Sequence, residues 1–360
     1  YRKVRVLNKQ HVDGDGRSPA SVSRRALLVG AVGIAVLQRG SREAQATAAC
    51  RPSPATGLQF VSGARTQPIS NTDGYRQLKD PCVVSDGQTW HLYGTGWTVG
   101  DSAAVIFHAR SDSATGPFTM NTPCSLHGVF GGGVAAPGVV VEDGVFHMFI
   151  QTEFKRPHGT LEHLVSTDGD SFVWADTALT ADPSLGDAVI YDAQPCTIGG
   201  IRYVAYAAGT RVGETELHLA RSEGSWSGPW IRLGPIVRQS DIVFQNRFGC
   251  AGYEWGLEGP QLVELPNGQV LLFGVCFLAG PKNGHRQRVF AARAPGPMGP
   301  YEVLGIPFDP RTDSWAQGEN GHPGAILTGD SVAVFYQGRD GAGKRWKVGT
   351  ATMQLTSFLR

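Results

Sequence analysis

The chain carries at positions 79–94 the stretch KDPCVVSDGQTWHLYG, and this stretch decides the prediction of the fold. An acidic residue, Asp80, precedes a proline, and a short apolar run follows it. A polar turn at Asp86 and Gly87 separates that run from a second one, which is rich in aromatic residues. Two such runs joined by a short turn that contains glycine are typical of a β-hairpin.

Four further stretches repeat this pattern along the chain. They are APGVVVEDGVFHMF at 136–149, DAQPCTIGGIRYVAY at 192–206, EGPQLVELPNGQVLLF at 258–273 and HPGAILTGDSVAVFY at 322–336. Aligned on Pro81, Pro137, Ala193, Gly259 and Pro323, the copies recur at steps of 56, 56, 66 and 64 residues. Four-stranded propeller blades repeat at about 40–50 residues, and extended loops lengthen the step. The five copies therefore predict an all-β fold, a five-bladed β-propeller.

A second repeat lies between the copies and supports the same fold. β-rich segments at 104–111, 217–222 and 288–294 are each followed by Gly-Pro and an aromatic residue, at 116–118, 228–230 and 299–301. The segment at 161–167 is followed by an aromatic run at 172–174. These segments read as the outer strands, so we expect four strands in each blade.

The N-terminal region differs in composition from the rest of the chain. Ser23-Arg24-Arg25 precedes an apolar run at 26–37 that is too short to span a membrane comfortably. Paired arginines before such a run resemble a twin-arginine export signal, with small residues for cleavage at 44–49. A plain secretory signal or a short anchor is the alternative. We predict an export signal and disordered N-terminus at 1–49, the propeller domain at 50–360, and a secreted or extracytoplasmic protein without stable membrane insertion.

The composition limits the partners and cofactors. A hydrophobic content of 41% in 360 residues suffices for a large core, and a net charge of +1 argues against dedicated nucleic-acid binding. None of the six cysteines has the spacing of a zinc site, and no Asp-rich calcium loop occurs. Export would permit disulfides, although the sequence does not assign their partners. We expect a monomer.

The residues that begin the innermost strands converge at one mouth of a propeller channel. These positions hold Asp80, Ala136, Asp192, Glu258 and His322. Hydrolysis of a glycosidic bond needs a proton donor and a second carboxylate that acts as base or nucleophile. A third carboxylate nearby raises the pKa of the donor. Any one of these acids alone more simply caps a turn or is solvated, but three at repeat positions favour catalysis.

The pattern resembles glycoside hydrolase family 43 and its clan of five-bladed propeller enzymes. The residues that carry the resemblance are Asp80-Pro81, Ala136-Pro137, Asp192-Ala193 and Glu258-Gly259-Pro260. The resemblance implies that Asp80 is the general base, Glu258 the general acid, and Asp192 the carboxylate that raises the acid's pKa and orients it. It also implies inversion at the anomeric carbon, no required cofactor, and an oligosaccharide or polysaccharide substrate with arabinose or xylose units.

Two features of the sequence leave alternatives open. If Pro195 rather than Ala193 matches Pro81, Gln194 takes the aligned place and Asp192 is displaced. In the related neoagarooligosaccharide hydrolases, which remain a possible match, a histidine has the acid role, so His322 competes with Glu258 for that role. A structural calcium near His322, or a simple hydrogen-bonded core histidine, are the other interpretations of this residue.

Sugar sites also need aromatic platforms and polar side chains that reach the hydroxyl groups. The substrate-binding candidates are Trp97, Phe154, Trp255, His322 and Arg339, with Trp315 as a further aromatic near the inner strands. Each aromatic residue fits a core position equally well, and a surface ion pair is the alternative for Arg339. A non-catalytic propeller that binds a glycan or a protein is the competing function, although it would not need all three acids.

Overall fold

The computed structural model describes residues 67–129, 133–152, 159–242, 245–246, 249–250, 256–279, 285–308, 315–316, 318–339 and 345–359. Regular structure in these ranges is almost entirely strand, with a few short 3₁₀ turns. The predicted export signal at 1–49 lies outside the described residues. Within the described ranges, no helix has the length and apolar character that a membrane crossing requires.

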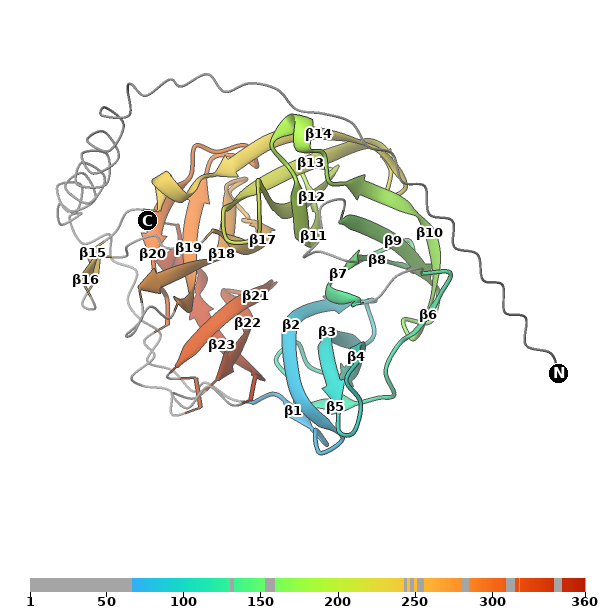
Figure 1. Ribbon diagram of the computed structural model, residues 1–360. Coiled ribbons are helices and arrows are strands. Elements are labelled where there is room, and N and C mark those ends of the chain that lie inside the picture. Colours follow the sequence, from blue (N-terminus) through green and yellow to red (C-terminus); the bar gives the residue numbers. More distant parts are fainter. Residues whose placement is uncertain are drawn as a thin grey trace, which may run out of the picture. The chain divides into compact units, whose positions relative to one another are not determined.

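Five sheets surround one axis, as Figure 1 shows, and this confirms the predicted five-bladed β-propeller. The innermost strands are β2 (Tyr75–Ser85), β7 (Ala135–Glu142), β11 (Val189–Ile198), β17 (Glu258–Glu264) and β21 (Glu319–Thr328). The second strands are β3 (Trp90–Thr98), β8 (Val145–Thr152), β12 (Ile201–Gly209), β18 (Val270–Ala279) and β22 (Ser331–Arg339). The third strands are β4 (Ala104–Ser111), β9 (Thr160–Ser166), β13 (Thr215–Ser225), β19 (His285–Ala294) and β23 (Lys347–Gln354). Further out lie β5 (Phe118–Met120), β10 (Ser171–Thr180), β14 (Gly228–Val237) and β20 (Glu302–Gly305).

The blades are not uniformly four-stranded, so that expectation is wrong in detail. The described strands form sheets of five, five, four, four and three members, in chain order. The first two blades gain short fifth strands, β1 (Ile69–Ser70) and β6 (Ser125–His127), which pair in parallel with β5 and β10. A separate two-stranded ribbon, β15 (Gln245–Asn246) with β16 (Gly249–Cys250), precedes blade four.

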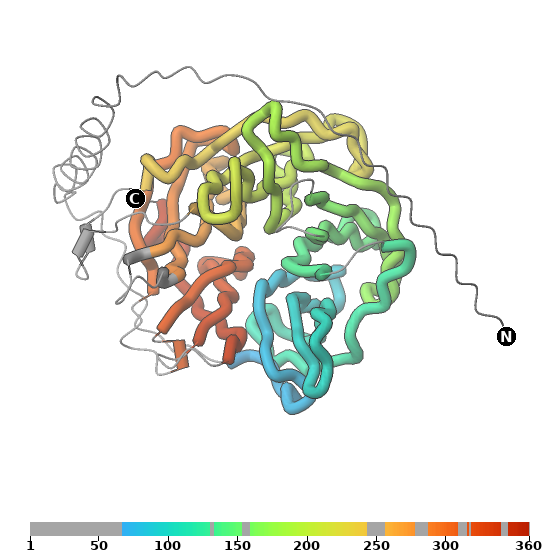
Figure 2. Tube along the Cα trace, viewed as in Figure 1, coloured from blue at the N-terminus to red at the C-terminus, as the bar shows by residue number. Residues whose placement is uncertain are grey.

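The ring closes by packing of blade five against blade one. In Figure 2 the blue start of the propeller lies beside its red end, and β2 contacts β21, β22 and β23. No described strand joins these two sheets, because β1 pairs with β5 inside its own blade. Phe118 meets Phe335 edge-to-face in this seam, with ring centroids 5.8 Å apart. Apolar packing therefore holds the seam together with individual hydrogen bonds, such as that from the Leu78 amide to the Trp346 carbonyl oxygen.

Each pair of neighbouring blades buries its own apolar cluster. The five large clusters combine residues from blades one and two, two and three, three and four, four and five, and five and one. Because both faces of a blade are covered, its strands are apolar almost without alternation. In β18, for example, Val270, Leu271, Leu272 and Phe273 are all fully buried.

Every innermost strand contains a bulge at the same place. One extra residue stands between the paired positions, and this residue has a left-handed backbone. The extra residues are Asp80, Ala136, Asp192, Gly259 and His322, with φ of 53°, 49°, 59°, 54° and 44°. Ala193 is therefore the equivalent of Pro81, which settles the register of blade three in favour of Asp192. The expected equivalence of Glu258 and Asp80 is wrong, because Glu258 precedes the bulged Gly259 and corresponds to Lys79.

Close contact across the bulges makes the second blade sensitive to one added methyl group. A Cβ atom on Gly138 would lie 2.1 Å from the Ala193 carbonyl oxygen of blade three. We therefore expect Gly138→Ala to lower the free energy of unfolding by about 1–3 kcal/mol, the usual cost of overpacking. Urea unfolding followed by fluorescence measures the change. Gly296→Ala is the matched control, because a Cβ there meets nothing within 4 Å. Equal stability of the two variants would contradict this packing.

Candidate active site

The bulges bring the predicted acids to one cavity at the axis. Asp80, Asp192, Glu258 and His322 all line this cavity, whose volume is about 460 Å³ and within the usual range of small-molecule sites. Its remaining lining includes Lys79, Trp97, Ser102, Ala103, Ala104, Val134, Ala135, Gln151, Tyr191 and Gln287. Four residues that the sequence predicted from four different blades are thus neighbours in space.

Side chains from the preceding blade fix the backbone of the bulged residues. The Asp80 amide donates to Gln337 Oε1 at 3.0 Å, and the Asp192 amide donates to Gln151 Oε1 at 2.6 Å. Gln337 and Gln151 occupy equivalent places on the second strands of blades five and two. Each buried amide therefore has a hydrogen-bond acceptor although it has no partner in the strand ladder. These hydrogen bonds fix the position of each aspartate along the channel axis.

His322 lies between two carboxylates. Its Nε2 is 2.7 Å from Asp192 Oδ2, and its Nδ1 is 3.6 Å from Asp80 Oδ1. Burial alone would lower the pKa of His322, but the charges of Asp192 and Asp80 outweigh burial and raise it to about 9. A raised pKa favours the imidazolium at neutral pH, in which Nε2 donates to Asp192 and Nδ1 faces the charge of Asp80.

Asp80 is held in its ionised form. Burial alone would raise its pKa, but the Lys79 ammonium and the His322 imidazolium outweigh burial and bring the pKa below its ordinary value. Lys79 Nζ lies 3.6 Å from Asp80 Oδ1. This buried oxygen accepts no hydrogen bond from any residue that the structure describes, so it is available to a water molecule or a substrate in the cavity.

Glu258 has the opposite electrostatic environment. Burial raises its pKa to about 7, and the negative charge of Asp192 adds to the increase. The Tyr191 hydroxyl donates to Glu258 Oε1 at 3.1 Å and lies 3.0 Å from the Thr215 hydroxyl, which fixes the direction of the carboxyl group. A half-buried acid with a pKa near 7 exists in both protonation states at neutral pH, as proton donors in enzymes require.

Asp192 connects the histidine to the bulge of blade four. Its Oδ2 accepts from His322 Nε2 and, at 3.1 Å, from the Gly259 amide. Gly259 has φ of 54°, a conformation that glycine adopts without strain. Asp192, Glu258 and His322 each offer one ligand atom, and these atoms lie within 4.8 Å of one another, so the three residues could hold a metal ion.

The other substrate-binding candidates have different surroundings. Trp97 lines the cavity, whereas Phe154 and Trp255 lie outside the described residues. Arg339 forms an ion pair with Glu319, and its guanidinium lies 4.6 Å from the Trp346 ring centroid. Trp315 stacks on Tyr336 with centroids 5.4 Å apart, so it is a packing residue.

Sequence reasoning missed the residues that support the acids. Lys79 and Tyr191 stand directly before Asp80 and Asp192, at the place in the bulge that Glu258 occupies in blade four. Gln151 and Gln337 lie on the second strands of blades two and five, opposite the residue that precedes the bulge. An alignment of the residue before the bulge in all five copies of the repeat would have identified Lys79 and Tyr191 as candidates.

Comparisons with known proteins identify the fold and leave the family open. No family model matches the chain, and no curated protein matches it. Among solved structures, the catalytic domain of a Coprinopsis cinerea family 62 α-L-arabinofuranosidase matches with a TM-score of 0.57 and 14% identity, over 82% of this chain and 96% of that one. A Bacillus subtilis arabinanase matches with 0.55 and 16%, over 78% and 96%. A Cellvibrio cellulosa α-L-arabinanase solved with arabinohexaose matches with 0.54 and 14%, over 77% and 92%. The expected likeness to five-bladed propeller glycosidases is confirmed for the fold.

The pKa values of His322, His108 and His147 give a direct test of the electrostatics. We expect the His322 ring to titrate near 9, while His108 and His147, whose burial lowers their pKa to about 4, titrate far below it. Because the pKa is raised by folding, the stability that His322 contributes is complete below its unfolded value of about 6.5 and is lost as the pH rises through 9.

Proton NMR of the imidazole signals measures these values, with the His322→Gln spectrum for assignment. A His322 signal that titrates at 6.5 or below would contradict the arrangement of the two carboxylates around its ring.

Proposed function

We propose that the chain is an inverting glycoside hydrolase that cleaves arabinofuranosyl or xylosyl bonds in an oligosaccharide or polysaccharide. One observation carries the proposal: two carboxyl groups in one cavity have pKa values shifted in opposite directions. The pKa of Asp80 is lowered and that of Glu258 is raised to about 7. Pairs of acids separated in this way are how enzymes assign a base and an acid at one pH.

The reaction divides between these two groups. Ionised Asp80 takes a proton from a water molecule, whose oxygen then forms the new bond to the anomeric carbon. Protonated Glu258 gives its proton to the glycosidic oxygen as the old bond breaks, so the leaving sugar departs as a neutral alcohol. Attack from the face opposite the leaving group inverts the configuration. Glu258 ends as the carboxylate and Asp80 as the acid, and exchange with solvent restores both.

Asp192 and His322 have supporting roles in this proposal. The charge of Asp192 keeps a proton on Glu258, while its hydrogen bonds to His322 and Gly259 keep it in place. His322 balances the charges of Asp80 and Asp192 as a fixed cation. Its raised pKa and its short contact with Asp192 favour Glu258 over His322 as the acid, because an imidazolium that holds its proton to pH 9 is a weak donor.

The matched structures and the cavity support the proposed sugar class. Several neighbours are described as arabinofuranosidases or arabinanases, and one as a xylan β-1,4-xylosidase. Trp97 supplies an aromatic surface in the cavity, and Phe154 and Trp255 remain proposed platforms. Arg339 acts indirectly, because it holds Glu319, whose Oε1 accepts from the Gln287 amide beside the substrate. We propose a monomer.

A structural calcium near His322 fits the donor set poorly. Calcium prefers six to eight oxygen ligands. Here the nitrogen nearest the carboxylates holds a proton and donates to Asp192 at 2.7 Å, so a metal would have to displace that proton. The chemistry above uses no metal, and the imidazolium occupies the position between the acids.

Export by the twin-arginine route is part of the proposal and rests on Ser23-Arg24-Arg25 before the apolar run. We expect Arg24→Lys with Arg25→Lys to stop secretion while synthesis continues, since the receptor reads the arginine pair. Immunoblots of medium and cells measure both. Arg2→Lys with Arg5→Lys is the matched control, because it makes the same chemical change earlier in the basic region. Unchanged secretion of the Arg24/Arg25 variant would leave an ordinary signal peptide.

The division of roles is tested with two leaving groups. Asp80→Ala should lose most activity on every substrate, because water must always be activated. Glu258→Gln should lose about 10²–10⁴-fold on a natural arabinoside or xyloside and much less on an aryl glycoside whose phenolate departs without a proton. Steady-state kcat/KM values on both substrates measure the difference, and NMR of the first product gives the anomeric configuration.

His322→Gln is the comparison variant for this experiment. Full activity of Glu258→Gln on the natural glycoside, together with loss of activity in His322→Gln, would move the acid role to the histidine. A first product with retained configuration would contradict inversion.

A further inference from the structure

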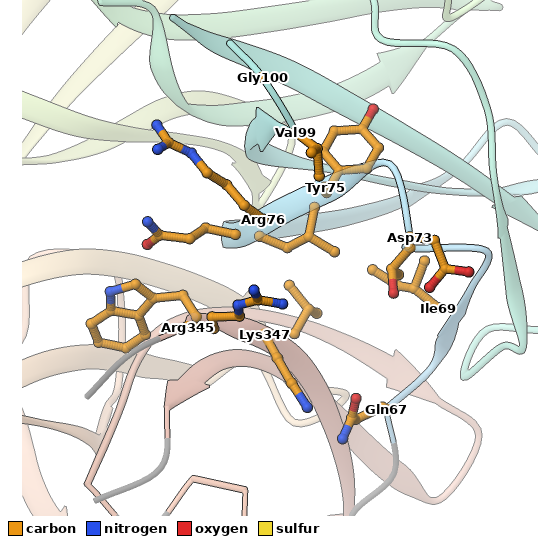
Figure 3. Close-up of a pocket in the computed structure, with 14 residues that line it drawn as sticks. Gln67, Ile69, Asp73, Tyr75, Arg76, Val99, Gly100, Arg345 and Lys347 are labelled. Carbon is orange, nitrogen blue, oxygen red and sulfur yellow. The ribbon is translucent and has the colours of Figure 1, made fainter. Parts of the chain in front are cut away.

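A second cavity lies beside the active-site cavity, between blades one and five. Its volume is about 340 Å³, and it is lined by the chain around β1, the start of β2 and the start of β23. Its polar lining includes Gln67, Asp73, Arg76, Gln77, Arg345 and Lys347, and we call it the cationic pocket. Figure 3 shows Arg76 on one side of this pocket, with Arg345 and Lys347 on the other.

The described residues leave three positive charges of this pocket without an ion pair. Arg76, Arg345 and Lys347 are exposed and form no ion pair with any residue that the structure describes, and Asp73 is the one carboxylate in the described lining. Other arginines behave differently. For example, Arg110 pairs with Asp170, Arg202 with Glu142, and Arg232 with Asp187. Three unpaired cations around one hollow produce a local positive potential on a chain that is nearly neutral overall.

Two features link the lining of the cationic pocket to that of the active-site cavity. Val99 and Gly100 line the pocket, while Ser102 to Ala104 of the same connection between β3 and β4 line the cavity. Trp346 also lines the pocket, and its ring centroid lies 5.6 Å from Lys79 Nζ, which reaches the cavity and Asp80. The two hollows are thus bordered by consecutive residues of one connection and by side chains that contact each other.

We propose that the cationic pocket binds the carboxylate of a uronic acid unit in the polysaccharide whose neighbouring bond enters the active-site cavity. This proposal rests on the proposed glycosidase function and makes the substrate an acidic glycan. Arg76 and Arg345 offer planar donor pairs that match a carboxylate, and Lys347 adds a point charge. The amides of Gln67 and Gln77 suit sugar hydroxyls, whereas the rings of Tyr75 and Trp346 are engaged by Phe107 and by Arg339 and Lys79 and form part of the wall. A free inorganic anion would use only the charges.

Binding of trigalacturonate to the full chain tests the site by isothermal titration calorimetry. Arg345→Gln with Lys347→Gln should weaken binding about tenfold or more, as expected for loss of charge-assisted hydrogen bonds. The methyl ester of trigalacturonate, which has the same hydroxyls and no charge, should bind as weakly to the parent protein as the acid binds to the variant. Raising the salt concentration should weaken only binding of the acid. Arg221→Gln, which removes an arginine that pairs with Glu223 outside the pocket, is the matched control and should bind normally.

Several results would overturn the proposal. They are unchanged trigalacturonate affinity in the double variant, equal affinity for the acid and its ester, or equally tight binding of inorganic phosphate, which would indicate a site for free anions. The same variants are assayed for hydrolysis of a neutral aryl glycoside. Absence of hydrolysis in the parent protein would count against the glycosidase function alone, whereas normal hydrolysis with unchanged trigalacturonate affinity in the double variant would count against the pocket alone.

Discussion

The extra residue in each innermost strand is the constraint on which the site depends. A regular strand at the axis would direct alternate side chains into the neighbouring blades, where apolar clusters fill the space. The bulge turns one residue out of the ladder into a left-handed conformation and leaves its amide without a strand partner. A side chain of the preceding blade accepts that amide at Asp80, Ala136 and Asp192. The bulge thus places these residues in the channel, and the hydrogen bond fixes them to the preceding blade.

The charges of the neighbouring side chains then determine the protonation state of each acid in the cavity. Two aspartates on the bulges would repel each other in a buried channel, and the His322 imidazolium between them removes most of that cost. Lys79 adds a second cation beside Asp80, while Glu258 faces the charge of Asp192 and is held by a neutral tyrosine hydroxyl. One acid is consequently ionised and the other tends to keep its proton. The difference arises from which neighbours carry charge, because all of these groups are buried or half-buried.

The sequence predicted the fold well because the propeller is built from local hairpins that repeat. It also located Asp80, Asp192, Glu258 and His322, since a polar residue before Pro, Ala or Gly at the start of an apolar strand is visible in a single chain that repeats the pattern. The place of Glu258 was wrong by one residue, because the alignment used Gly259 where the bulge makes Pro260 the equivalent of Pro81. Gln151 and Gln337 were missed because their partners are amides on another blade, a contact that no local pattern encodes. The additional strands β1 and β6 were missed because each is only two or three residues long.

The seam between the first and last blades passes through the middle of the site. Asp80 belongs to blade one, whereas His322 and the glutamine that holds the Asp80 amide belong to blade five. No described strand is shared across this seam. In a chain whose last blade has not yet docked, the first blade is therefore locally complete, but Asp80 lacks both the His322 imidazolium and the Gln337 side chain that accepts from its amide. The proposed active site is therefore assembled only when the ring closes, and in a newly made or partly opened molecule its groups stay apart until the first and last blades meet.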